Sequence, residues 1–216
     1  MEDHVLLADA LDMTLSAEGF DVRRIDPPVD ETISTALLLS TILRARAQIV
    51  LLDLDLGLAG DGVRLIGPLA RAGAQVVVLT ASPDRGRWGE CLRHGARVVV
   101  PKSHPLREVV TRVRRMQEGF PVMTVAERDD LLRTYFQQRQ EVDELNTRLG
   151  RLTRREQQVL DHLVEGRTVR EIAERAVVAE ATVRTQVKSI LAKLEVSSQL
   201  AAVGVAHRAG WSMSRT

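Results

Sequence analysis

Four polar side chains follow short apolar runs in the first half of the sequence. Asp9 follows "HVLLA", Asp53 ends "QIVLLD", Thr80 ends "QVVVLT" and Lys102 follows "ARVVVP". Such runs are typical of buried strands, and parallel strands bring their carboxyl ends to one edge of a sheet. There, carboxylates can bind a hard divalent cation, and one can attack phosphorus as a nucleophile. A Thr hydroxyl and a Lys ammonium can bind phosphoryl oxygens. The pattern therefore predicts phosphoryl chemistry centred on Asp53.

The elements that must position these residues alternate in period along residues 1–120. Longer segments with helical spacing, such as Ile33, Leu37, Leu38 and Ile42, separate the apolar runs. The five runs are "HVLLA", "FDVRRI", "QIVLL", "QVVVLT" and "ARVVV". Short strands that alternate with helices predict an α/β domain with a doubly wound parallel sheet of five strands.

Four segments of this domain, "VLLAD", "VLLDLDLG", "LTAS" and "VVVPKS", resemble the receiver domain of bacterial two-component response regulators. The resemblance covers residues 4–118. It implies that Asp53 is the phosphoacceptor and that Thr80 and Lys102 contact the phosphoryl group. It also implies a Mg²⁺ site formed by Asp9, Asp53 and the backbone carbonyl of Asp55, and a sensor histidine kinase as partner.

The first strand departs from the receiver pattern. Receivers usually have an acidic pair there, whereas Asp9 is followed by Ala10. The segment up to Gly19 is also about seven residues shorter than usual, or two helical turns. Either Asp9 keeps its place before a short helix, or "DALDMTLSAEGF" is the helix itself and the acidic pair is missing. In both cases we expect Mg²⁺ binding to be weak or absent, and an atypical, phosphorylation-independent regulator is the alternative.

A second alternative is an enzyme. "LLDLDLG", "VVVLT" and Lys102 also resemble the first three motifs of haloacid-dehalogenase-type phosphohydrolases, which need a further acidic pair after the Lys. The domain offers only Glu108 and Glu118 there, both inside an expected helix. The sequence therefore favours a protein that is not an enzyme.

Residues 121–149 are expected to form a linker helix, because no Gly or Pro occurs from Val122 to Leu149. Its apolar stripe has heptad spacing with one polar position, and comprises Leu131, Tyr135, Gln138, Val142, Leu145 and Leu149. The stripe either pairs two chains in a homodimer or packs on the chain's own domains.

Residues 150–216 are expected to form an all-α domain of four helices. Thr153 with Glu156, and Thr168 with Glu171, have capping-box spacing at the start of two helices. The turn "VVAE" then leads into "ATVRTQVKSILAKLEV", so the pattern predicts a helix-turn-helix. The apolar face of the second helix comprises Val183, Val187, Ile190, Leu191 and Leu194, opposite a polar face of Arg184, Thr185, Lys188 and Ala192.

The segments "LTRREQQVL", "EGRTVREIA", "ATVRTQVKSILAKLEV" and "AGW" resemble the LuxR-type (NarL/FixJ-type) DNA-binding domain. The resemblance implies that Arg184, Thr185 and Lys188 face the bases of double-stranded DNA. It places near the phosphates Arg170, Thr182, Gln186 and Lys193. Ala179 departs from the family, which usually has Ser as the cap of this helix.

Charge and composition agree with this reading. Residues 151–216 carry eleven basic and seven acidic side chains, a net charge of +4, whereas residues 1–120 carry fifteen and sixteen. A basic module suits a polyanion such as DNA. Cys91 is the single cysteine, no stretch approaches the roughly 18 apolar residues of a membrane span, and no signal pattern opens the sequence. We therefore expect a cytoplasmic response-regulator transcription factor.

Overall fold

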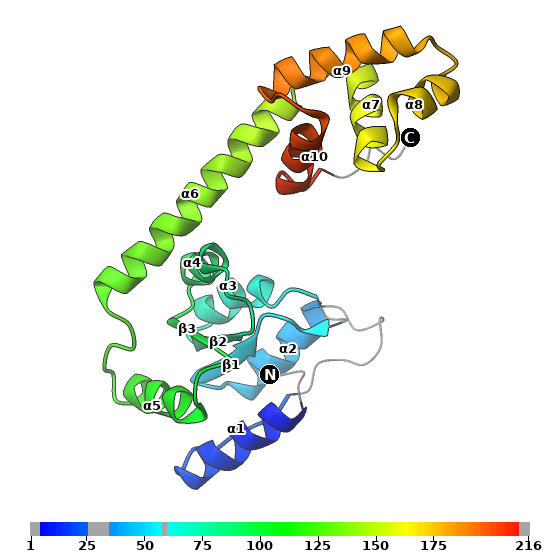
Figure 1. Ribbon diagram of the computed structural model, residues 1–216. Helices are drawn as coiled ribbons and strands as arrows, with labels where there is room; N and C mark the ends of the chain where they lie inside the picture. Colours follow the sequence, from blue (N-terminus) through cyan, green and yellow to red (C-terminus); the bar gives the residue numbers. More distant parts are fainter. Residues whose placement is uncertain (1–4, 26–34, 58–59, 212–216) are drawn as a thin grey trace. The chain divides into compact units, whose positions relative to one another are not determined.

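The computed structural model describes residues 5–25, 35–57 and 60–211, and it divides into two compact units, Met1–Phe136 and Gln137–Thr216 (Figure 1). The first unit has hydrophobic clusters that include residues of its strands, and the second has one cluster built from helices.

The first unit contains a parallel sheet in the order β1-β2-β3. Its strands are β1 (Ile49–Asp53), β2 (Gln75–Thr80) and β3 (Val98–Pro101), and Val78 pairs with Leu52 on one side and Val99 on the other. The three strands are almost wholly apolar and mostly buried, as expected for parallel strands that are covered on both faces.

Helices cover both faces of this sheet, as the doubly wound pattern predicted. They are α1 (Val5–Ala17), α2 (Thr35–Ala45), α3 (Val63–Arg71), α4 (Arg85–His94) and α5 (Leu106–Gln117). The buried residues of α2, α3 and α4 form one cluster with Leu52, Val76 and Val78. Those of α1 and α5 form another with Val77 and Leu79.

The prediction of five strands is wrong for the part of the chain that the structure describes, which contains three. Residues 5–8 of the first expected strand belong to α1, and the second expected strand, residues 20–25, has no regular structure. His4 lies outside the described residues. The reason is visible in the spacing of Ala8, Leu11 and Leu15, which are all buried and lie three and four residues apart. That helical period overrides the short apolar run that suggested a strand.

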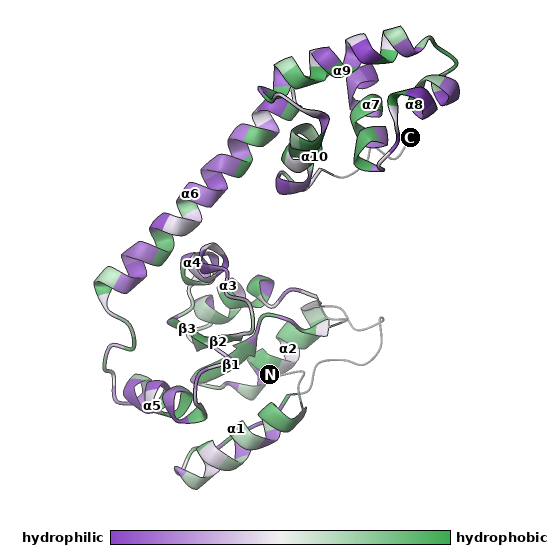
Figure 2. Ribbon diagram, in the orientation of Figure 1, coloured by the Kyte–Doolittle hydropathy of each residue, from purple (hydrophilic) through white to green (hydrophobic). Residues whose placement is uncertain are grey.

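The expected linker helix is present as α6 (Val125–Leu149), which is mostly hydrophilic in Figure 2. Leu131, near its start, is buried in a cluster of the first unit. At its other end Leu149 is buried in the second unit, and Leu145 packs against the same cluster. Both ends of the apolar stripe therefore pack on the chain's own domains, which was one of the two expectations for it.

The second unit adds the four predicted helices, α7 (Arg154–Val164), α8 (Val169–Ala176), α9 (Glu180–Leu194) and α10 (Gln199–Arg208). Both predicted capping boxes are formed, at Thr153 and at Thr168. The Trp211 indole donates a hydrogen bond of 2.7 Å to Asp161 of α7, which holds the end of the domain against its core.

No single helix in the described ranges is both long and apolar enough to cross a membrane. α9 and α10 meet the criterion of length and composition only as a pair, bent by 53°. Both helices bury side chains in the core of the second unit.

Candidate DNA-binding surface and receiver-like acidic site

The ends of the three strands bring together three of the predicted site residues. Asp53 ends β1, Thr80 ends β2 and Lys102 follows β3. Asp53 and Thr80 are almost fully buried, with 1% and 2% of their surface exposed. The Lys102 ammonium donates a hydrogen bond of 2.5 Å to Asp53 Oδ2, so the buried carboxylate faces a positive charge. The backbone N–H of Lys102 also donates to the Thr80 carbonyl, which holds Lys102 beside the end of β2.

Asp55 lies in the loop that follows β1. Its backbone N–H donates to Asp53 Oδ1 at 3.2 Å, and its own carboxylate accepts a bond from the Gly57 N–H. A single-residue bridge pairs it with Asp61 across this loop. The loop therefore keeps the Asp55 backbone beside the Asp53 carboxylate, while the Asp55 side chain bonds the Gly57 N–H within the turn.

Asp9 does not lie at a strand end, as the sequence analysis expected, because it belongs to α1. Its side chain is 54% exposed and forms an ion pair with Arg24. This arrangement matches the alternative in which "DALDMTLSAEGF" is the first helix and supplies no acidic pair. Within the described ranges, no three His, Cys, Asp or Glu side chains converge on a point where a metal could bind. The residues that the structure describes thus do not fit the receiver Mg²⁺ site.

The acids that the phosphohydrolase alternative required are elsewhere. The Glu108 carboxylate contacts the His104 ring, and Glu118 follows the last residue of α5. Neither residue lies at the strand ends beside Lys102.

In the second unit, α9 presents the polar face that the sequence predicted. Val183, Val187 and Ile190 are buried against α7 and α8, which packs the apolar face into the core. The side chains of Arg184, Thr185 and Lys188 are exposed. The Thr185 hydroxyl donates to the Ala181 carbonyl at 3.0 Å.

The residues predicted near phosphates lie around this face. Arg170, on α8, and Thr182 are exposed, and Gln186 is half-buried. Lys193 is the exception, because its ammonium donates a hydrogen bond of 2.6 Å to the buried carboxylate of Glu156. Ser189 donates to the same carboxylate at 2.6 Å.

Glu156 is the centre of a network that joins α7 to α9. Burial raises the pKa of its carboxyl group, but hydrogen bonds from Lys193, Ser189 and Thr153 outweigh burial and lower the pKa to about 2. Sequence reasoning identified Glu156 as half of a capping box but missed its bonds to α9. Their partners are 33 and 37 residues away, and no local pattern signals contacts at that separation.

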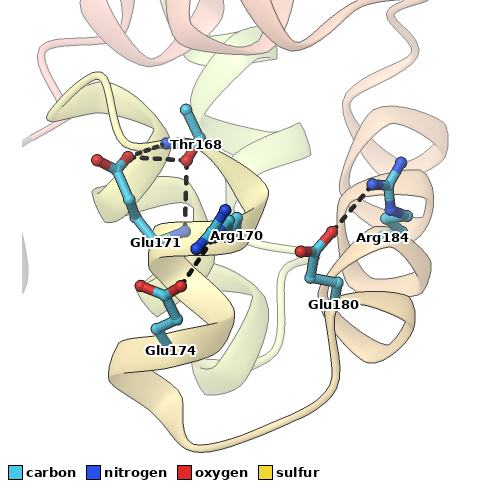
Figure 3. A network of polar contacts seen from close by, with 6 residues as sticks. All are labelled: Thr168, Arg170, Glu171, Glu174, Glu180 and Arg184. Carbon is cyan, nitrogen blue, oxygen red and sulfur yellow. Dashed lines mark hydrogen bonds and ion pairs between the residues drawn. The ribbon is translucent and has the colours of Figure 1, made fainter.

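Two arginines of the candidate surface are held by carboxylates of their own helices (Figure 3). Arg184 donates to Glu180 at 3.0 Å, and Arg170 donates to Glu174 at 2.9 Å. Both pairs have i, i+4 spacing, which is readable from the sequence. Sequence reasoning followed only the basic members and missed the two acids.

Comparison with known proteins agrees with this architecture. Residues 150–206 match the family model "Bacterial regulatory proteins, luxR family". The chain is 28% identical over 215 residues to the virulence factors putative positive transcription regulator BvgA of Bordetella pertussis, covering 96% of this chain and 95% of that protein. It is 23% identical over 170 residues to the transcriptional regulatory protein DesR of Bacillus subtilis, covering 79% and 78%.

Among solved structures, RcsB from Salmonella enterica serovar Typhimurium bound to a promoter aligns with a TM-score of 0.49 and 20% identity, over 94% of each chain. The luxR-family match covers most of the second unit, where α8 and α9 form the predicted helix-turn-helix. This unit follows a receiver-like α/β domain and a long helix, the order expected from the resemblance to NarL/FixJ-type response regulators.

Proposed function

We propose that this protein regulates transcription by binding a specific double-stranded DNA sequence through α9. The observation that carries the proposal is the polar face of α9, exposed opposite side chains buried in the core of a luxR-family domain. A helix of this kind fits the major groove, where side chains reach base edges. The names of its relatives, which are transcription regulators, support the same function.

Three side chains are assigned to base reading. Arg184 and Lys188 donate to guanine acceptors, because cations on a major-groove helix find O6 and N7 there. Thr185 presents its methyl group to thymine, since its hydroxyl already bonds the Ala181 carbonyl. Arg170, Thr182 and Gln186 contact phosphates. Lys193 is left out of this set because it serves the Glu156 network.

We propose that Asp53 is the phosphoacceptor position of the first domain. Its support is the buried carboxylate at a strand end, with Lys102 and Thr80 at the neighbouring ends. One observation favours regulation without phosphorylation, namely that Asp9 lies in α1 and brings no second carboxylate to Asp53. DNA binding by the unmodified chain is therefore part of the proposal.

The remaining partners are proposals as well. We expect a homodimer, because palindromic half-sites are bound by two-fold pairs of such domains. We favour α10 as the dimer surface, because 82% of its Leu200 is exposed. The apolar stripe of α6, by contrast, packs largely against the cores of this chain. A cytoplasmic location and a sensor histidine kinase remain proposals from the family resemblance.

The test selects preferred DNA from a random library with the full chain, then measures affinity by fluorescence anisotropy. Arg184→Ala and Lys188→Ala should each cost about 1–3 kcal/mol on the selected site and relax base preference at one position. Lys193→Ala is the control, which we expect to lower stability and leave base preference intact. If neither Arg184→Ala nor Lys188→Ala changed affinity or preference, the assignment of α9 would be wrong.

A further inference from the structure

The two ion pairs of Figure 3 lie on the surface to which DNA binding is assigned. In the pair on α9, 70% of the Arg184 side chain and 44% of the Glu180 side chain are exposed. In the pair on α8, the corresponding values for Arg170 and Glu174 are 76% and 62%. Solvent-exposed pairs of this kind contribute little to folding stability. Folding stability therefore does not explain why these carboxylates lie beside cations that are assigned to DNA binding.

Glu180 acts on both arginines. It accepts the hydrogen bond of Arg184, one turn further along α9. Its charge also raises the pKa of Arg170, where it adds to the larger effects of the hydrogen bond and charge of Glu174. Figure 3 shows Arg170 on α8 on the side of that helix that faces Glu180. One carboxylate at the start of α9 thus lies between the two helices of the helix-turn-helix and influences a cation on each.

We propose that Glu180 is a specificity-determining residue, whose carboxylate lowers the affinity of the domain for DNA that lacks the preferred bases. This inference rests on the DNA-binding function proposed above. On non-specific DNA, Arg184 can gain only phosphate contacts, and the Glu180 carboxylate that it bonds offsets its positive charge. Glu180 is then repelled by the same phosphates. The net gain in binding free energy is small, so binding to non-specific DNA stays weak.

At the preferred site the balance differs. A guanidinium has five N–H donors, so Arg184 can bond guanine O6 and N7 and still keep its bond to Glu180. The carboxylate then fixes the side chain in the orientation that reads the base. Glu180 thus restrains Arg184 for base reading and opposes binding to phosphates. Both effects increase the difference between specific and non-specific affinity.

The experiment compares Glu180→Gln with the unaltered chain on the selected DNA and on a scrambled duplex, at several salt concentrations. Removing the carboxylate should raise affinity for scrambled DNA by about three- to ten-fold, because a negative charge no longer offsets Arg184 or repels the phosphates. The slope of log affinity against log salt on scrambled DNA should steepen by up to about 0.9, the value of one phosphate contact. Affinity for the selected site should change less. The specificity ratio, which is the affinity for the selected DNA divided by that for the scrambled DNA, should therefore fall.

Glu195→Gln is the matched control for net charge. Glu195 is exposed at the other end of α9, pairs with Arg151 and Arg148, and lies away from the base-facing side chains. The Glu195→Gln variant should leave the specificity ratio unchanged. In the background of Arg184→Ala, Glu180→Gln should no longer lower that ratio, which separates an action through Arg184 from a change in the stability of α9.

The outcomes distinguish this inference from the function beneath it. If the unaltered chain shows no preference between the two duplexes, both are wrong. If it discriminates, but Glu180→Gln behaves as Glu195→Gln does, only the role of Glu180 is overturned. The same holds if Glu180→Gln lowers affinity equally on both duplexes.

Discussion

At the scale of single residues, Glu156 shows how one buried charge can be stabilised by its neighbours. Only 9% of its side chain is exposed, and it accepts hydrogen bonds from the capping residue of α7 and from two residues of α9. A buried carboxylate without such partners would be expensive. The network therefore holds α9 to α7, the first helix of the domain.

The lowered pKa of Glu156 predicts a dependence of stability on pH. Because the folded pKa of about 2 lies below its ordinary value of 4.5, the carboxylate stabilises the domain above pH 4.5 and loses this effect as the pH falls towards 2. The shift corresponds to about 3 kcal/mol at neutral pH. Glu156→Gln should therefore be less stable than the unaltered chain at pH 7 in urea unfolding, and this difference should fall to less than half at pH 3. Glu195→Gln controls for the loss of one charge, and a difference that is the same at both pH values would contradict the role of Glu156.

The strand ends of the first unit show which positions residue-level reasoning could predict and which it could not. Asp53, Thr80 and Lys102 were predictable because each follows an apolar run of strand length, and parallel strands must end together. Asp9 follows a similar run, but its neighbours Leu11 and Leu15 pack with a helical period. A run of four apolar residues does not distinguish strand from helix, so its partner elements decide.

At the scale of elements, α9 begins without a side-chain cap. Ala179 occupies the N-cap position with extended backbone, φ −69° and ψ 144°, and no side chain accepts the free N–H groups of the first turn. Thr153, Thr168 and Ser198 provide that bond for α7, α8 and α10. The element that we assign to DNA is thus the one with the weakest start among these four helices.

Ala179→Ser should stabilise the second domain by about 0.5–2 kcal/mol, because its backbone is already in the cap conformation. Thermal or urea unfolding monitored by circular dichroism measures the gain. Ser198→Ala is the reciprocal variant and should lose a similar amount at α10, where the cap bond to Ala201 is 3.1 Å. No gain from Ala179→Ser alongside a loss from Ser198→Ala would mean that water satisfies the start of α9 equally well.

The helix α6 illustrates a limit of pattern reading. Its length was predictable from the absence of Gly and Pro, but its stripe fitted either a dimer or packing within the chain. The structure buries Leu131 in one core and Leu149 in the other. Periodicity reveals that a face is covered, and only tertiary contacts reveal what covers it.

At the scale of the whole molecule, the proposed dimer predicts the effect of a surface change. Leu200→Asp should reduce the fraction of chains bound to DNA as pairs, because it places a charge on an exposed apolar residue of α10. It should not unfold the domain, since Leu200 is outside the buried core. Light scattering measures the mass of the protein alone and of its complex with DNA, which gives the number of chains in each. Val142→Asp, a half-buried residue of α6, is the comparison, and a loss of pairing there alone would place the dimer on the α6 stripe.

The first domain predicts how the molecule responds to a phosphodonor. With acetyl phosphate and Mg²⁺, phosphorylation of Asp53 should be slow or absent by intact mass, because Asp9 lies in α1, paired with Arg24, and does not join Asp53 as a metal ligand. We expect Mg²⁺ binding weaker than about millimolar, and DNA binding by the unmodified chain. Asp53→Asn is the control. A different result would contradict this prediction: rapid, stoichiometric phosphorylation that is lost in Asp53→Asn and is required for DNA binding. The protein would then be controlled by phosphorylation of Asp53.

The small number of base-facing side chains proposed for α9 has a consequence for how much sequence one domain can read. Those side chains, of Arg184, Thr185 and Lys188, span little more than one helical turn. Such a set can specify about three or four base pairs, a word that recurs by chance about once in every 60–250 base pairs of a genome. A single domain therefore carries too little information to mark one promoter. In the proposed dimer, a second domain at a fixed spacing along the same duplex supplies the missing information.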